Sequence, residues 1–316
     1  MTVLRKIPLL TWAFLIAFLL TNCQKEITVD LPDPVEKIVV EGSIETGSPP
    51  FVILNRNYPY FGQFNVDLYS TGFVRDAVVK VSDGSNTVTL TELCWSELTD
   101  VQKDFFAAQF GATLPDSLPA NFDFCLYTLF APTMVGQAGK NYTLDITTTD
   151  GQHLTANTTI PMPVPLDSVW VQPHNNPEFA DTLRRLWTQL TDPDTLGNYY
   201  RYYTQRNNEP LYPGLRSVFD DLVINGKQFY FPLDKAQPQS ADFDIDTYGY
   251  FHTQDTLRLK WVTVDKKTYD FWRSLEFSAS SGGPFSSIVQ VDFNIEGGMG
   301  VWAGYSIGTD TTFIVP

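Results

Sequence analysis

Ala77 to Glu92 reads AVVKVSDGSNTVTLTE, and this stretch decides the fold class. It holds two runs in which apolar and polar residues alternate, joined by Asp83-Gly84, a pair typical of a tight β-hairpin turn. With a repeat of two residues, one side of each strand faces the protein interior. The side chains predicted to face one core are Val79, Val81, Val88 and Leu90.

The same pattern recurs from Tyr142 to Ile160, where Asp150-Gly151 supplies the turn. A short β-branched run, Ile38 to Glu45 (IVVEGSIE), precedes both predicted hairpins. Recurring hairpins separated by turn signals favour an antiparallel arrangement. Residues 37–162 are therefore predicted to form an immunoglobulin-like β-sandwich domain.

A proline-rich stretch marks the predicted end of this domain, because Pro161, Pro163 and Pro165 lack the backbone N–H that a strand ladder needs. Residues 163–316 are predicted to form a second antiparallel β-domain, with one short helix at Tyr269–Phe277 (YDFWRSLEF). Its strand-like runs are Ser168–Gln172, Asn198–Gln205, Lys227–Phe231, Thr256–Val264, Ile288–Ile295 and Gly300–Ile307. The fold class predicted for the chain is mainly β.

The first 22 residues have the parts of an export signal. Arg5 and Lys6 precede Ile7–Leu20, an uncharged run of about 14 residues, which is too short to span a bilayer but suits a signal-peptide core. The run ends in Leu-Thr-Asn-Cys, which resembles a bacterial lipobox with Cys23 as the acylated N-terminal residue of the mature chain. The alternative is a plain secreted protein in which Cys23 is incidental. A polar, proline-bearing tether is expected at residues 23–36.

The chain of 316 residues is acidic, with 36 acidic against 21 basic side chains and a formal charge of −15. Removing residues 1–22 takes away two basic residues and no acidic one, so the predicted mature chain has a charge of −17. Such a chain has no basic stripe to neutralise phosphates, which excludes a nucleic-acid-binding protein.

With Cys23 assigned to lipid, Cys94 and Cys125 form an even pair in an exported chain, and this predicts a disulfide. The alternative is a metal pair, but no histidine lies near either cysteine, and two thiolates do not complete a tetrahedral site. No metal site and no cofactor are predicted.

A short helical insertion, Thr99–Phe110, lies between these cysteines. Thr99 and Gln102 have capping-box spacing, and Gly111 follows the last helical residue. A disulfide would pin both ends of this insertion to one sheet edge. We interpret the insertion as a cover for that edge, with a ligand lid as the alternative.

Patterns that suggest catalysis or metal binding are weak. Asp242, Asp244 and Asp246 alternate as calcium ligands do, but no Glu completes the loop, so a solvated acidic loop is favoured over a calcium site. Ser306 lies in a Gly-Tyr-Ser-Ile-Gly match to the nucleophile elbow, which we interpret as chance because His252, the last histidine, precedes it. His153, His174 and His252 are scattered and are interpreted as isolated. No catalytic residue is therefore assigned.

Two aromatic groups are candidates for ligand binding. The first contains Tyr58, Tyr60, Phe61 and Phe64 in a loop-like stretch, and the second contains Tyr199, Tyr200, Tyr202 and Tyr203 on a predicted strand. Alternation sends the second group to both faces of its sheet. One face is core, and the other is either a cross-strand pairing surface or a platform for sugars or peptides.

Several segments together resemble a known family. They are the lipobox with Gln24-Lys25-Glu26, the run Ile38–Gly42, the segment from Asp192-Pro193-Asp194 to Arg201, and Asn294–Trp302 (NIEGGMGVW). In order and spacing they look like the Bacteroidota lipoproteins of domain of unknown function 4249, over nearly the whole mature chain. The resemblance carries over no catalytic residue. Because the genes of such lipoproteins tend to lie beside those of TonB-dependent receptors, it implies an outer-membrane, surface-facing accessory to nutrient uptake, with a periplasmic orientation as the alternative.

The hypothesis favoured is a non-enzymatic lipoprotein, held at the outer membrane by lipid on Cys23, which binds a small-molecule, glycan or peptide ligand or a TonB-dependent receptor. The alternative is an envelope hydrolase or calcium-dependent enzyme, which would need a cluster around His252 or the Asp242 loop. A purely structural adhesion module is a third hypothesis.

Overall fold

The computed structural model describes residues 36–57, 72–103, 124–238, 241, 243–280 and 290–316. From Glu36 on, they belong to one compact unit. The signal peptide and nearly all of the tether predicted for residues 1–36, including Cys23, lie outside the described residues, as does the first aromatic group between Tyr58 and Phe64.

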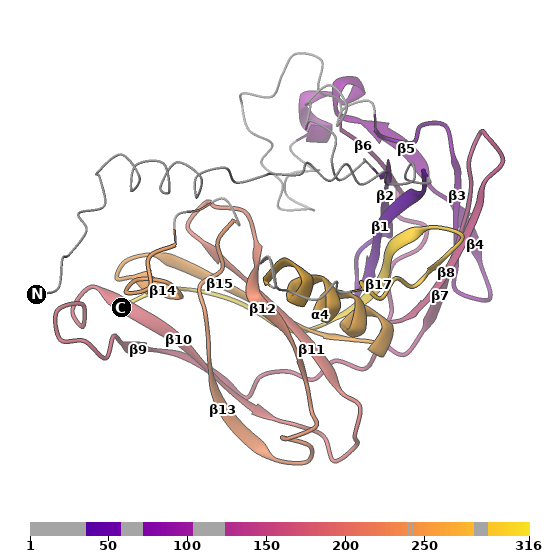
Figure 1. Cartoon of the computed structure of the whole chain (residues 1–316). Helices are drawn as coiled ribbons and strands as arrows, with labels where there is room; N and C mark the ends of the chain where they lie inside the picture. The colour runs from indigo at the N-terminus through magenta and orange to yellow at the C-terminus, as the bar shows by residue number, and fades with distance from the viewer. Residues whose placement is uncertain (1–35, 58–71, 104–123, 239–240, 242, 281–289) are drawn as a thin grey trace, which may run out of the picture. The chain divides into compact units, whose positions relative to one another are not determined.

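The described chain folds mainly into strands, arranged in three sheets (Figure 1). The eight-stranded sheet has the order β12 (Tyr212–Asp220), β11 (Tyr199–Arg206), β15 (Thr256–Val264), β17 (Met299–Ile314), β1 (Ile38–Glu45), β2 (Phe51–Arg56), β6 (Cys125–Thr128), β5 (Thr91–Cys94). The five-stranded sheet has the order β16 (Ile295–Glu296), β8 (His153–Thr159), β7 (Asn141–Thr147), β3 (Val78–Ser82), β4 (Thr87–Thr89). In the third sheet β10 (Leu183–Thr191) pairs with β9 (Ser168–Pro173), β13 (Gln228–Leu233) and β14 (Tyr250–His252). The named helices of the described residues are η1 (Trp95–Glu97) and α4 (Lys266–Ser280).

The hairpin predicted from Ala77 to Glu92 is confirmed. β3 and β4 are antiparallel, with Val81 opposite Val88, and Gly84 adopts a φ of +88° in the turn. Val79 and Val81 are fully buried in the first hydrophobic core. β5 then continues into the eight-stranded sheet, so this stretch supplies strands to both layers. The second predicted hairpin is β7 and β8.

Two apolar cores lie between sheets. The first contains side chains from Ile38 to Ile160 together with Ile295 and Trp302, and the second contains side chains from Val164 to Val315. These cores fall mostly on either side of the boundary predicted between residues 162 and 163, but the eight-stranded sheet takes strands from both sides of it. That domain boundary stays a prediction.

β1 and β17 are paired in parallel, with Gly42 opposite Trp302. The other named strand pairs are antiparallel, as predicted. Gly300 has a φ of +104°, and a Cβ at this position would overlap the carbonyl oxygen of Val40 on β1. Glycine therefore allows the two backbones to approach at the start of this parallel pairing.

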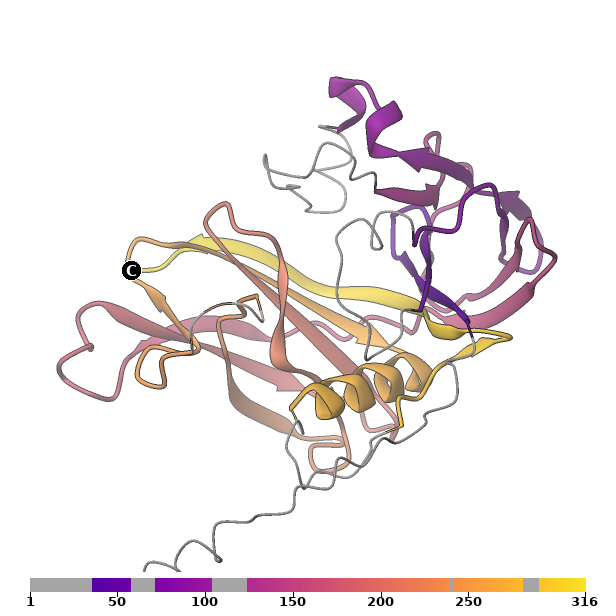
Figure 2. The ribbon, with the colours of Figure 1, turned by 45° about the horizontal axis from the view of Figure 1, so that its top comes forward.

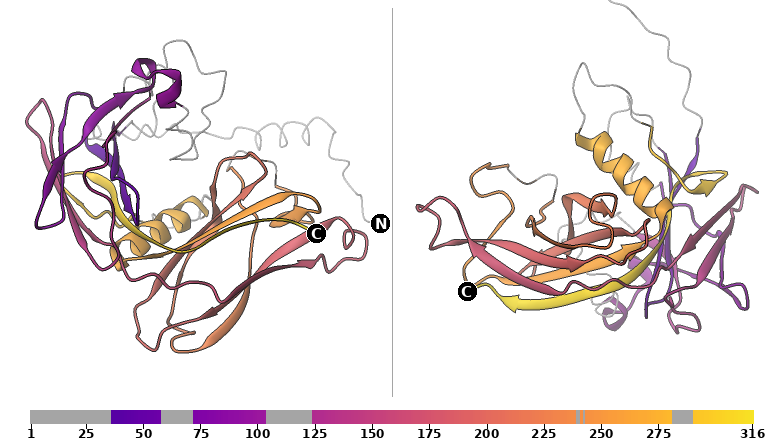
Figure 3. Two further views of the ribbon diagram at one scale, coloured as in Figure 1. Left: turned by 180° about the vertical axis from the view of Figure 1, so that it is seen from behind. Right: turned by 90° about the horizontal axis from the view of Figure 1, so that it is seen from below.

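α4 contains the helix predicted at Tyr269–Phe277 and is longer at both ends. It begins after Asp265, whose Oδ1 accepts a hydrogen bond from the N–H of Thr268 at 2.8 Å, the geometry of an N-cap. Its apolar side packs on one face of the eight-stranded sheet (Figure 2). The opposite face of the same strands is covered by the third sheet, which Figure 3 shows from behind.

The predicted helical insertion is described only at its start. Residues 100–103 are helical, and Thr99 and Gln102 exchange the expected capping contacts, with Gln102 Oε1 accepting from the Thr99 N–H at 2.8 Å. The rest of Thr99–Phe110 lies outside the described residues. The strand predicted at Ile288–Ile295 is wrong in its described part, residues 290–295, because only Ile295 there is in a strand. Asn294 instead uses its side chain to bind the Trp302 backbone in both directions, which turns the chain there.

Candidate functional site

The predicted disulfide is formed. Cys94 and Cys125 lie opposite one another in the antiparallel register of β5 and β6, are buried, and are joined through their sulfurs. Since β5 is an edge strand of the eight-stranded sheet, the bond fixes both ends of the intervening segment to that edge, as predicted.

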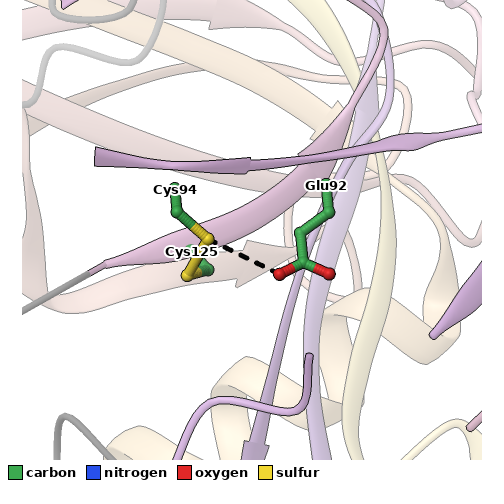
Figure 4. A group of neighbouring side chains, drawn as sticks. All are labelled: Glu92, Cys94 and Cys125. Carbon is green, nitrogen blue, oxygen red and sulfur yellow. Dashed lines mark hydrogen bonds between the residues drawn. A yellow bond between two sulfur atoms is a disulfide. The ribbon is translucent and has the colours of Figure 1, made fainter. Parts of the chain in front are cut away.

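Glu92 lies beside this bond, with its Oε1 3.5 Å from Cys94 Sγ (Figure 4). The carboxylate accepts hydrogen bonds from the Asp76 N–H at 2.6 Å and the Tyr127 hydroxyl at 3.1 Å, and it is paired with Arg75. Among the described residues, the one group with ligand atoms close enough to share a metal ion is Glu92, Cys94 and Cys125. The sulfurs are bonded to each other, so neither offers the thiolate that zinc needs.

The three histidines lie on different elements. His153 Nε2 is 2.9 Å from Asp145 Oδ2, the ring of His174 is 4.2 Å from that of Tyr250 between centroids, and His252 is exposed on β14. Within the described parts of the chain, none of them belongs to a cluster of three ligand-type side chains.

The acidic loop is described in part. Asp244 and Asp246 are exposed, and the Asp246 N–H donates to Asp244 Oδ1 at 3.0 Å, as in a local turn. Asp242 lies outside the described residues, so the calcium site stays a hypothesis. Ser306 is fully buried within the long strand β17, which is not the strand-turn-helix of a nucleophile elbow, and the chance match is confirmed.

The tyrosines of β11 point to both faces, as alternation predicts. Tyr200 and Tyr202 are buried in the second core, where Tyr200 stacks on Trp261 with centroids 5.0 Å apart. Tyr199 and Tyr203 pack in the layer beneath α4, where Tyr199 lies 4.7 Å from Tyr269. Both faces of this strand are therefore covered by another layer, so these tyrosines do not form the exposed platform for sugars or peptides that was one of the two alternatives.

Arg201, on the same strand, is a buried cation that the sequence analysis missed. It is 2% exposed, and its guanidinium lies 3.5 Å from the ring centroid of Trp272 on α4. Its Nε donates to Ser217 Oγ at 3.0 Å, and its Nη1 lies within 3.3 Å of the Tyr305 hydroxyl. Ser217 in turn donates its N–H (2.9 Å) and its hydroxyl to the Glu276 carboxylate.

These contacts join four elements, because Arg201 is on β11, Ser217 on β12, Glu276 on α4 and Tyr305 on β17. Burial raises the pKa of Glu276 above its ordinary value, while the hydrogen bonds from Ser217 and the charge of Arg201 oppose that shift. Every one of these groups is engaged with another side chain or with backbone. The cluster therefore fixes α4 to the sheet, which is a structural role.

A different surface has the properties of a binding site. On the outer face of the third sheet, Trp170 of β9 is opposite Trp187 of β10, and the indole centroids are 6.4 Å apart with planes 26° from parallel. Tyr230 of β13 completes the group, with its ring 6.3 Å from that of Trp170 and its side chain 53% exposed. The two tryptophans are partly exposed.

Polar side chains surround these rings, and Arg185, opposite Gln172, is paired with Asp234. Ser168 is opposite Gln189, which is opposite Tyr230, and Gln172 follows Trp170 on the same face of β9. Ser168 and Gln172 are exposed, and the Ser168 hydroxyl donates to Gln189 Oε1 at 3.2 Å. We call this surface the tryptophan face; its residues are Ser168, Trp170, Gln172, Trp187, Gln189 and Tyr230.

The opposite face of the same strands explains why these side chains point outward. Val169, Val171, Leu186 and Leu190 alternate with them and pack in the second core. Sequence reasoning missed the tryptophan face because β10 was not predicted as a strand. The signal was present in LRRLWTQLT, where Leu186, Thr188 and Leu190 are buried at alternate positions.

No helix of the described residues is long and apolar enough to cross a membrane. Comparison with curated proteins gives no match. The family model for a domain of unknown function, DUF4249, matches residues 24–311, so the chain belongs to the DUF4249 family.

Proposed function

We propose that this chain is a non-enzymatic binding lipoprotein of the bacterial outer membrane and an accessory to a TonB-dependent receptor. The observation that carries the binding role is the tryptophan face, an exposed sheet surface with three aromatic rings and no covering element among the described residues. Aromatic rings beside well-placed polar groups are the usual lining of ligand sites.

Export is supported by the Cys94–Cys125 disulfide, since such bonds persist in oxidising compartments outside the cytosol. The anchor is supported by the sequence alone, through the charged start, the apolar run and the lipobox that ends at Cys23. Three acyl chains on that cysteine would hold the protein at a membrane far more firmly than one. The receptor partnership is supported only by what the family resemblance implies.

Two measurements test this proposal. Mass spectrometry of the N-terminal peptide from purified outer membranes should show acylated Cys23, and C23A should release the protein into the soluble fraction. An unmodified Cys23 in the membrane-bound protein would contradict the anchor.

Cross-linking of the tagged full chain in intact cells, followed by solubilisation, should recover a TonB-dependent receptor, with C23A as the matched control. Recovery of the lipidated chain without any receptor would contradict the accessory role.

A further inference from the structure

We infer that the tryptophan face is a glycan-binding site that takes a neutral oligosaccharide. This inference rests on the proposed binding role and names the ligand class.

The first argument is the geometry of the rings. A pyranose ring has two faces of C–H groups and a rim of hydroxyls, so it is recognised by flat aromatic surface below and hydrogen-bonding groups beside it. Trp170 and Trp187 have indole planes 26° from parallel, on neighbouring strands whose opposite face packs in the second core. Tyr230 lies across β10 on β13, with its ring edge-on to that of Trp170 at 70° between the planes. The Trp170 ring centroid lies 6.4 Å from that of Trp187 and 6.3 Å from that of Tyr230, so three aromatic side chains are close enough to contact one ligand.

The second argument is the polar rim. Gln172 and Gln189 each carry an amide that both donates and accepts, and Ser168 carries a hydroxyl. These groups match sugar hydroxyls, which also donate and accept. A purely apolar partner would displace water from the Gln172 and Gln189 amides without replacing its hydrogen bonds, at a cost to the partner's affinity.

The third argument is charge. Arg185 is the cation next to Gln172 in the sheet, and its guanidinium is paired with Asp234 at 2.6 Å. The six residues of the tryptophan face carry no formal charge. The chain as a whole has a charge of −15, which repels anionic ligands, while the face offers no carboxylate to attract a cationic one. A neutral ligand therefore binds here without electrostatic repulsion and without needing a charged partner on the face.

The test uses the purified full chain in detergent and a panel of soluble neutral hexasaccharides built from glucose, mannose, xylose or galactose. Binding is measured by isothermal titration calorimetry and by tryptophan fluorescence. At least one hexasaccharide should bind, and W170A and W187A should each weaken that binding at least tenfold. Q172A and Q189A should each weaken it several-fold while the thermal midpoint stays close to that of wild type.

Phe277→Ala is the matched control, because Phe277 is an exposed aromatic residue (59%) on α4, away from the third sheet. It should bind the hexasaccharide as wild type does. W170F guards against loss of fold, since it keeps an aromatic ring on the face and should retain part of the affinity.

Absence of binding across the panel overturns the inference, as does binding that survives both W170A and W187A. Preference for an uncharged peptide over every hexasaccharide also overturns it. The outcome is separable from that of the proposed function: receptor recovery unchanged in W170A without glycan binding removes only the glycan site. Glycan binding without acylated Cys23 or a receptor removes the anchor and the accessory role and leaves the site.

Discussion

Arg201→Met should lower the free energy of unfolding by about 3–5 kcal/mol. Methionine keeps an unbranched apolar stem in the same space but removes the cation and its donors. A hydrogen bond from a charged donor contributes about 1.5–3 kcal/mol, and a desolvated cation–π contact about 2 kcal/mol. In the structure the buried guanidinium donates to Ser217 at 3.0 Å and lies 3.5 Å from the Trp272 ring centroid; its longer contacts to the Tyr305 hydroxyl (3.3 Å) and the Tyr203 ring (4.9 Å) are left out of this sum. The sum agrees with the cost of breaking a buried charge network by removing one member.

The loss should also depend on pH, through Glu276. Its pKa is raised in the folded protein by burial, and the charge of Arg201 limits that increase. A carboxyl group with a raised folded pKa stabilises the fold below its ordinary pKa of 4.5, and this contribution is lost as the pH rises through the folded value. In R201M the folded pKa rises further. The difference in stability between wild type and R201M should therefore grow from pH 4.5 towards neutral pH.

Urea unfolding followed by fluorescence at several pH values measures both effects. The double variant R201M/E276Q is the control, because it removes the carboxylate that R201M leaves without its cation. The loss of stability in the double variant should be smaller than the sum of the losses in R201M and in E276Q, which is the sign of coupling within one network. A cost below about 1 kcal/mol for R201M, or a difference that is constant with pH, would refute this account of the cluster.

Three further changes test other parts of the fold. C94A/C125A should cost about 4 kcal/mol, since the cysteines are 31 residues apart, and dithiothreitol should lower the thermal midpoint of wild type but not of the variant; equal midpoints for reduced and oxidised wild type would contradict this. G300A should cost several kcal/mol or prevent folding, because alanine is strained at φ +104° and has no space against β1, and near-normal urea unfolding would be the contrary result. Y200F should cost about 1–3 kcal/mol, because it removes the Tyr200 hydroxyl that donates to the buried Asp192 carboxylate. Since burial raises the pKa of Asp192, this carboxyl is charged at pH 8 more than at pH 4, and the cost should be larger at pH 8. A larger cost at pH 4 would count against the assignment.

The local parts of the fold could be predicted from the sequence. Both predicted hairpins exist because an Asp-Gly turn and a two-residue alternation lie within one short segment. The start of the helical insertion was also predictable, because a capping box needs only residues three apart. The disulfide was predictable from the even number of remaining cysteines and the predicted export, rather than from geometry.

The long-range parts could not be predicted in this way. The parallel partners β1 and β17 are about 260 residues apart, and neither segment carries a pattern that names the other. Arg201 looked like a charged residue on a tyrosine-rich strand, and only the approach of α4 and β12 encloses it. The tryptophan face is split between β9 and β10, so its rings become neighbours only through the strand register.

The parallel pairing of β1 with β17 also has a consequence for synthesis of the chain. Because the chain is synthesised from its N-terminus, β1 is made early and one of its backbone edges is unpaired. The partner for that edge, β17, is made only after some 250 further residues. Until then the first core lacks Trp302, one of its largest fully buried side chains. The open edge of β1 is therefore unpaired for nearly the whole of translation, the stage at which such edges promote aggregation. A product cut short before residue 299 keeps an open strand edge, which exposes it to aggregation or proteolysis.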